Sequence, residues 1–360
     1  MIYHCEDHTC NYWDEGEKLP ERCPQCGRKL LRANEADMTG DDWTALGNTL
    51  WDAEASDKKR MVDCFRKAAY LGSAWGVCNL GICMEQGNGV EADPVQAFWL
   101  YQQAVEMGSL NAVCCLGVCY QYGIGTAPDA EKAAELYCKA AEYGSPRGQM
   151  LLARAFHDGI GVEADAAEAV HWVRAAAYQR YGEGMYRLGV CYEYGDGVEQ
   201  NWEHAVHWFR EAAESGVSAA MTDLGYCYEK GCGVEQSWEQ AFSWYRRGAE
   251  CGYPVSMSNL GLCYKRGYGV EQNWQEAIKW YEQGAQCGDL QSMHNLACCY
   301  ERGEGVEQNE DRALYWYRRS AEGGNGSAMC NLGRCYKRGY GVEQNWQEAV
   351  KWYEQGAQCG

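Results

Sequence analysis

Apolar residues recur along this chain at spacings of three and four positions, and the whole pattern repeats every 36 residues. Within one copy, Leu260, Cys263 and Tyr264 lie on one face of a helix. A Leu-Gly or Leu-Ala pair marks the same point in eight copies, at Leu80, Leu116, Leu152, Leu188, Leu224, Leu260, Leu296 and Leu332. Such a fixed period predicts a solenoid in which each unit packs on its neighbours, and it excludes a single globular core.

Each copy is predicted to form two antiparallel helices. The first helix ends at a glycine such as Gly267, which suits the left-handed position after a helix. The second begins after a side chain that caps its first free amides. These caps are Asp93, Asp129, Asp165, Asn201, Ser237, Asn273, Asn309 and Asn345. We therefore expect about nine helix pairs, namely a degenerate capping pair in residues 35–72 and eight repeats in residues 73–360.

A cysteine stands three residues after the marker leucine in seven of the eight copies. The seven are Cys83, Cys119, Cys191, Cys227, Cys263, Cys299 and Cys335. Neighbouring copies lie on the order of 10 Å apart in stacked helices, whereas a disulfide needs Cα atoms within about 7 Å. We interpret these cysteines as small buried apolar side chains.

The repeated letters LGxCYxxGxGVEQNxxxAxxWYxxxAxxG resemble the Sel1-like repeat family, which is related to the tetratricopeptide repeats. The resemblance covers residues 38–360. It implies an all-α, right-handed superhelical α/α solenoid. It also implies a non-catalytic adaptor that binds a protein or peptide, since that is what most members of the family do.

Residues 1–34 differ from the repeats because they carry two pairs of cysteines. Cys5 and Cys10 precede Cys23 and Cys26, and the second pair forms a C-P-x-C-G turn. Tetrahedral Zn²⁺ takes four such ligands, and His8 is an alternative ligand to Cys10. The segment resembles a zinc ribbon or a rubredoxin-like knuckle. We predict a structural zinc, because four protein ligands leave no open position for a substrate and the segment is too short to bury a core.

The net charge of −19 lies almost entirely in the repeats. This acidity disfavours binding to nucleic acid or anionic membranes, which relies on clustered cations. The first ten residues, MIYHCEDHTC, lack the basic start and apolar core of a signal peptide, and no run of 18 apolar residues occurs. We therefore expect a cytoplasmic protein with reduced thiols.

Candidate binding residues lie on the first helix of the C-terminal copies. If this helix lines the inner wall, as the resemblance to tetratricopeptide arrays implies, two repeat positions face a groove. The residue before the leucine gives Asn259, Asn295 and Asn331, and the residue six after it gives Lys230, Arg266, Arg302 and Arg338. These residues favour a groove for an extended acidic segment or a carboxylate. Alternatively, the cations only complement the dipole of the helix end.

The pattern as a whole favours a non-catalytic scaffold. The alternative is a metal- or redox-responsive regulator that uses the N-terminal cysteine site. A β-lactamase-like hydrolase is disfavoured, because the single S-x-x-K, Ser56 to Lys59, has no accompanying S-D-N or K-T-G.

Overall fold

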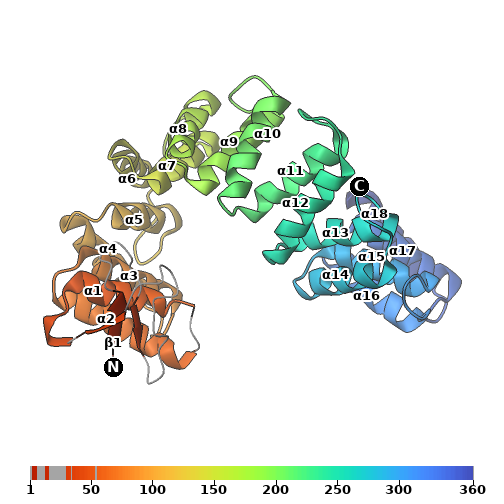
Figure 1. The fold of residues 1–360 in the computed structure, drawn as a ribbon, viewed down its shortest axis with the longest axis horizontal. Coiled ribbons are helices and arrows are strands. Elements are labelled where there is room, and N and C mark those ends of the chain that lie inside the picture. Colours follow the sequence, from red (N-terminus) through yellow and green to blue (C-terminus); the bar gives the residue numbers. More distant parts are fainter. Residues whose placement is uncertain (1, 6–12, 16–29, 34, 53–54, 360) are drawn as a thin grey trace. The chain divides into compact units, whose positions relative to one another are not determined.

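The computed structural model describes residues 2–5, 13–15, 30–33, 35–52 and 55–359. The chain forms two compact units, residues 1–179 and 180–360. Figure 1 shows each unit as a succession of paired helices. Among the described residues there are 18 α-helices, as expected for a helical repeat array. The right-handed superhelical sense of the whole array stays a prediction.

The first unit begins with a small antiparallel sheet of strand order β2-β1-β3. Its strands are β1 (Ile2–Cys5), β2 (Trp13–Glu15) and β3 (Leu30–Ala33). Cys5 ends β1 and pairs with Leu30, and His4 pairs with Trp13. Of the other predicted zinc ligands, Cys10, Cys23 and Cys26 lie outside the described residues, as does the alternative ligand His8.

The helices of the first unit follow a short 3-10 turn, η1 (Glu35–Asp37). They are α1 (Gly40–Thr49), α2 (Ala55–Tyr70), α3 (Ala74–Gln86), α4 (Pro94–Glu106), α5 (Leu110–Tyr122), α6 (Ala130–Glu142), α7 (Pro146–Asp158) and α8 (Ala166–Tyr178). The second unit contains α9 (Gly182–Tyr194), α10 (Trp202–Glu214), α11 (Ser218–Lys230), α12 (Trp238–Glu250), α13 (Pro254–Arg266), α14 (Trp274–Gln286), α15 (Leu290–Arg302), α16 (Glu310–Glu322), α17 (Gly326–Arg338) and α18 (Trp346–Cys359). No helix in the described part of the chain is long and apolar enough to cross a bilayer.

The connection between the two helices of a copy follows the predicted caps. Gly267 ends α13 in the left-handed region with φ 72°, a conformation that costs glycine little. The side chain of Asn273 then accepts the backbone amides of Gln275 and Glu276, each at 3.1 Å. The amide of Asn273 also donates to the carbonyl of Tyr264 at 2.9 Å, which ties the start of α14 to the end of α13.

A buried aromatic ring holds the two helices of most copies together, whereas Val173 takes this position between α7 and α8. Tyr281 of α14 is fully buried, and its ring lies so close to Gly261 of α13 that a Cβ there would overlap it. The same residue type fills this position in other copies, where the fully buried tyrosines are Tyr101, Tyr137, Tyr245 and Tyr317. Each ring excludes water from the helix interface and directs its hydroxyl toward the first helix of the pair.

The repeated cysteines are buried, as predicted. All seven are at most 9 % exposed, and all seven are free thiols. Burial raises the pKa of Cys83 to about 11 and that of Cys263 to about 12. These thiols therefore stay protonated and act as apolar packing groups.

The boundary between the two units falls at an irregular residue. Most copies close with a glycine of positive φ, such as Gly144 at 81° and Gly216 at 98°, but Arg180 holds this position with φ 59°. A left-handed conformation costs a residue with a Cβ about 1–2 kcal/mol. Arg180 therefore stores local strain at the junction.

We predict that Arg180→Gly stabilises the protein by about 0.5–1 kcal/mol, because the relief of backbone strain exceeds the added flexibility of the unfolded chain. The substitution also removes the exposed ion pair of Arg180 with Glu211, which contributes little. Thermal unfolding of the full chain measures the change. The matched control, Gly216→Arg, should lower the midpoint, and a lower midpoint for Arg180→Gly would contradict the prediction.

Candidate functional site

The first helices of the copies in the second unit carry exposed polar and charged side chains at repeated positions. We call the outward side chains of α11, α13, α15 and α17 the A-helix face, and we call the second helix of each pair a B helix. Successive first helices contact one another, as α11 does α13 and α13 does α15. Residues at corresponding positions in neighbouring copies therefore lie next to one another on this face.

The four predicted cations all lie on the A-helix face and are exposed to solvent. Lys230, Arg266, Arg302 and Arg338 are the last residues of α11, α13, α15 and α17. Lys230 pairs with the adjacent Glu229 at 2.8 Å, and Arg302 lies 3.7 Å from Glu304. Within the described residues, Arg266 and Arg338 have no ion pair. These cations stand just before the glycine that ends the first helix, where a positive charge also complements the helix dipole. Their position therefore fits both ligand binding and stabilisation of the helix end.

The three predicted asparagines are half-buried, and two of them are engaged within the array. Asn295 accepts a hydrogen bond from Gln291 at 3.1 Å. Asn331 donates its amide to Nε2 of His294 at 2.9 Å. No hydrogen bond of the Asn259 side chain is found among the described residues. The three asparagines therefore do not form a regular row of side chains that are all available to a ligand.

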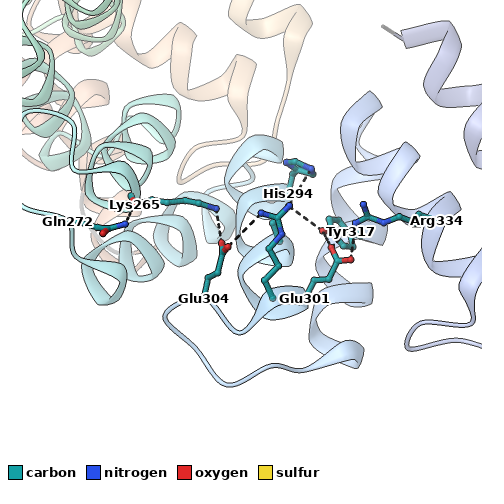
Figure 2. Close-up of polar contacts among 9 residues, drawn as sticks. Lys265, Gln272, His294, Glu301, Glu304, Tyr317 and Arg334 are labelled. Atoms are coloured by element: carbon teal, nitrogen blue, oxygen red, sulfur yellow. Dashed lines mark hydrogen bonds and ion pairs between the residues drawn. The ribbon is translucent and has the colours of Figure 1, made fainter.

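A set of charged contacts crosses from one copy to the next (Figure 2). Lys265 of α13 pairs with Glu304 at 3.1 Å, and Arg334 of α17 donates twice to Glu301 of α15, at 2.8 and 2.9 Å. The Lys265 side chain is only 14 % exposed, so this pair is more shielded from water than ordinary surface pairs. The sequence could have indicated these contacts through the fifth residue after the leucine, because its charge alternates in successive copies, at Glu229, Lys265 and Glu301.

His294 is a functional candidate that the sequence did not indicate. Its Nε2 accepts from Asn331 and lies 3.7 Å from Sγ of Cys298, and its ring centroid lies 5.9 Å from that of Tyr317. Burial lowers the pKa of His294, and the positive charges of Lys265, Arg302 and Arg334 lower it further, although a hydrogen bond with Asn295 opposes the shift. The imidazole is therefore neutral near pH 7.

The side chains around His294 are held by hydrogen bonds within the protein. The hydroxyl of Tyr317 donates to Glu301 at 2.7 Å and lies 3.2 Å from Sγ of Cys298. The acceptor nitrogen of His294 is already used by Asn331, so it is not free to act as a base toward the thiol. Among the described residues, no group of three or more His, Cys, Asp or Glu side chains could hold a metal ion.

Comparison with known proteins identifies related chains. The Sel1 repeat model matches eight segments, at residues 76–109, 112–145, 146–181, 182–217, 218–253, 254–289, 290–325 and 326–360. A protective antigen of uropathogenic Escherichia coli with an SLR fold is 34 % identical, with a TM-score of 0.67. The match covers 83 % of this chain and 64 % of that protein, so this chain spans less than two thirds of the antigen. A Sel1 repeat protein from Oxalobacter formigenes is also 34 % identical, with a TM-score of 0.62 and coverage of 68 % and 96 %. A search of curated proteins finds no match.

We predict that His294 makes the protein less stable in mild acid. Because the pKa of His294 is lowered on folding, the unfolded chain binds more protons as the pH falls below about 6.5, the ordinary value for histidine. His294→Gln should therefore lose less thermal stability between pH 7.5 and 5.5 than the unsubstituted chain. His207→Gln, at an exposed site on α10, is the control and should behave like the unsubstituted chain. An equal loss in His294→Gln would refute the prediction.

Proposed function

Because this chain belongs to the Sel1 repeat family, we propose that it is a non-catalytic scaffold that binds an extended acidic segment of a partner protein on the A-helix face. Sel1 repeat solenoids generally mediate protein interactions. The observation that carries the proposal is the recurrence of exposed cations at one repeat position, which gives Lys230, Arg266, Arg302 and Arg338.

We call Lys230, Arg266, Arg302 and Arg338 the cation strip. Because the rest of the chain is acidic, this strip is selective for acidic ligands. In a protein of net charge −19, an acidic ligand is repelled by most of the surface and attracted where cations gather. One cation recurs in each of the four C-terminal copies, so an extended segment meets a cation at regular intervals. Arg266 and Arg338 are available for such contacts, because neither has an ion pair with another described residue. Exposed cations of this kind mainly accelerate association and select the partner.

The N-terminal segment supports a second candidate function, a metal- or redox-responsive regulator. We propose that Cys5, Cys10, Cys23 and Cys26 hold one Zn²⁺, with His8 as the alternative to Cys10. Thiolate sulfurs suit zinc, which takes four such ligands in structural sites. Cys5 ends β1 opposite Leu30, which follows Cys26 by four residues in the chain. Zinc ligation and buried thiols both require reduced cysteines, so we propose the cytoplasm as the compartment.

We predict that the triple substitution of Arg266, Arg302 and Arg338 by Glu weakens binding of an octaglutamate peptide at least tenfold. The change replaces attraction by repulsion along the strip, and the loss should shrink as salt is raised. Fluorescence anisotropy measures the affinity, with octaglutamine as the uncharged comparison. The matched control reverses three exposed B-helix cations, Arg246, Lys279 and Lys351, and so makes the same change in net charge. Equal weakening by both triple variants would show that only net charge matters and would refute the proposal.

We predict that the purified full chain contains about one zinc per molecule. Elemental analysis measures the ratio, and the double substitution Cys23→Ser with Cys26→Ser should abolish it, because it removes half of the ligands. Cys251→Ser changes an exposed cysteine on the repeats and should leave zinc unchanged. Separate Cys10→Ala and His8→Ala variants decide between the alternative ligands. Metal retained by the double variant would exclude this site.

A further inference from the structure

Four copies contain the same hydrogen bond inside the helix pair. In each, the buried tyrosine of the B helix donates its hydroxyl to a side chain five positions after the marker leucine, at 2.6 to 2.9 Å. The pairs are Tyr101 with Glu85, Tyr137 with Gln121, Tyr245 with Glu229, and Tyr317 with Glu301. The acceptor is always a carboxylate or amide oxygen, so the array satisfies these hydroxyls from its own sequence.

The copy formed by α13 and α14 lacks this bond. Lys265 occupies the acceptor position, and an ammonium group cannot accept a hydrogen bond. Its Nζ instead pairs with Glu304 at 3.1 Å and lies 5.3 Å from the ring of Trp274. Tyr281 is 0 % exposed, and its hydroxyl has no hydrogen-bond partner among the described residues. A buried hydroxyl of this kind costs about 1–3 kcal/mol.

The surroundings of the Tyr281 hydroxyl favour an anionic acceptor. Arg266 follows Lys265 in the chain, is exposed and has no ion pair in the described part of the structure. Burial raises the pKa of the Tyr281 hydroxyl, and the positive charge of Arg266 opposes this shift with a smaller effect. A buried donor near Arg266, in a copy where Lys265 replaces the usual acceptor, matches a carboxylate, which accepts several charge-assisted hydrogen bonds.

We propose that Tyr281, Lys265 and Arg266 form a binding site for a carboxylate of the acidic segment, at the position that Glu229 and Glu301 fill in neighbouring copies. The inference rests on the proposed function and identifies one contact within it. The equivalent carboxylates of Glu229 and Glu301 are 19 % and 18 % exposed, so the position can be reached from the A-helix face. The hydroxyl of Tyr281 is covered in the free structure, so the site opens as the carboxylate enters. A glutamate side chain and a free C-terminus supply the same chemistry.

The test makes the same Tyr→Phe substitution in two different copies. Binding of octaglutamate to the full chain is measured with a free and with an amidated C-terminus, which distinguishes the two sources of carboxylate. Tyr281→Phe should weaken binding about tenfold, as expected for a lost hydrogen bond to a charged group. Tyr245→Phe is the matched control, because its hydroxyl already has Glu229, and it should leave the affinity unchanged.

A second pair of variants tests the acceptor position. Lys265→Gln supplies an internal amide acceptor of the kind that Gln121 provides for Tyr137, and it should weaken peptide binding about tenfold. Lys279→Gln removes the same charge from an exposed site on α14 and should have little effect. Without peptide, Tyr281→Phe should raise the thermal midpoint, because it removes a buried hydroxyl that has no partner in the described part of the chain. Tyr245→Phe should lower the midpoint, because Tyr245 loses a satisfied hydrogen bond.

Each outcome decides the inference. Weaker binding in Tyr281→Phe and Lys265→Gln, with both controls unchanged, supports the site. Unchanged affinity in Tyr281→Phe, combined with loss of binding in the triple arginine variant, overturns the site and leaves the proposed function standing. No binding of either peptide by the unsubstituted chain overturns both. A midpoint that falls as far in Tyr281→Phe as in Tyr245→Phe overturns the site, since the hydroxyl would then have a partner within the chain.

Discussion

In most copies the two helices approach each other where one buried aromatic ring packs against one glycine. Tyr281 lies against Gly261, and Phe209 lies in the same way against Gly189. The absence of a Cβ lets the two backbones approach, and the ring excludes water from the interface. With tyrosine the arrangement has a further requirement, because the ring brings a buried hydroxyl to the A-helix face and that hydroxyl needs an acceptor.

The polar contacts between copies depend on this geometry. Neighbouring first helices lie close enough for Arg334 to reach Glu301 and for Asn331 to reach His294. These groups are partly shielded from water, so their interactions are stronger than those of exposed pairs. They couple each copy to its neighbour only, as expected for a linear array. The A-helix face therefore serves the stacking of the copies and is at the same time the candidate binding surface, so a ligand that displaces one of these contacts also alters the stacking.

The features that could be predicted from the sequence are those contained within one copy. The left-handed glycine at Gly267, the cap at Asn273 and the burial of Cys263 each follow from residues close together in the chain, and repetition makes the pattern unmistakable. The environment of His294 could not be predicted, because its partner Asn331 lies 37 residues away and belongs to the next copy. The pairing of Lys265 with Glu304 likewise depends on which charge the neighbouring copy carries. The zinc ligands stay a prediction, because three of the four lie outside the described residues.

The close similarity of the copies makes their differences informative. Glu229 and Glu301 show that the chain satisfies a buried tyrosine hydroxyl wherever an acceptor stands at the fifth position after the leucine. At Lys265 the same chain forgoes that hydrogen bond, although a single substitution to glutamine would restore an internal acceptor. An unsatisfied buried group destabilises the free protein by about 1–3 kcal/mol, which is a large part of the stability of an ordinary domain. Departures from local consistency concentrate at functional sites, where binding restores what the free chain lacks. The last copy carries the equivalent residues Lys337, Arg338 and Tyr353, but Tyr353 is only half-buried. The fully buried and unsatisfied hydroxyl of Tyr281 therefore marks its copy as the place where a ligand completes the structure.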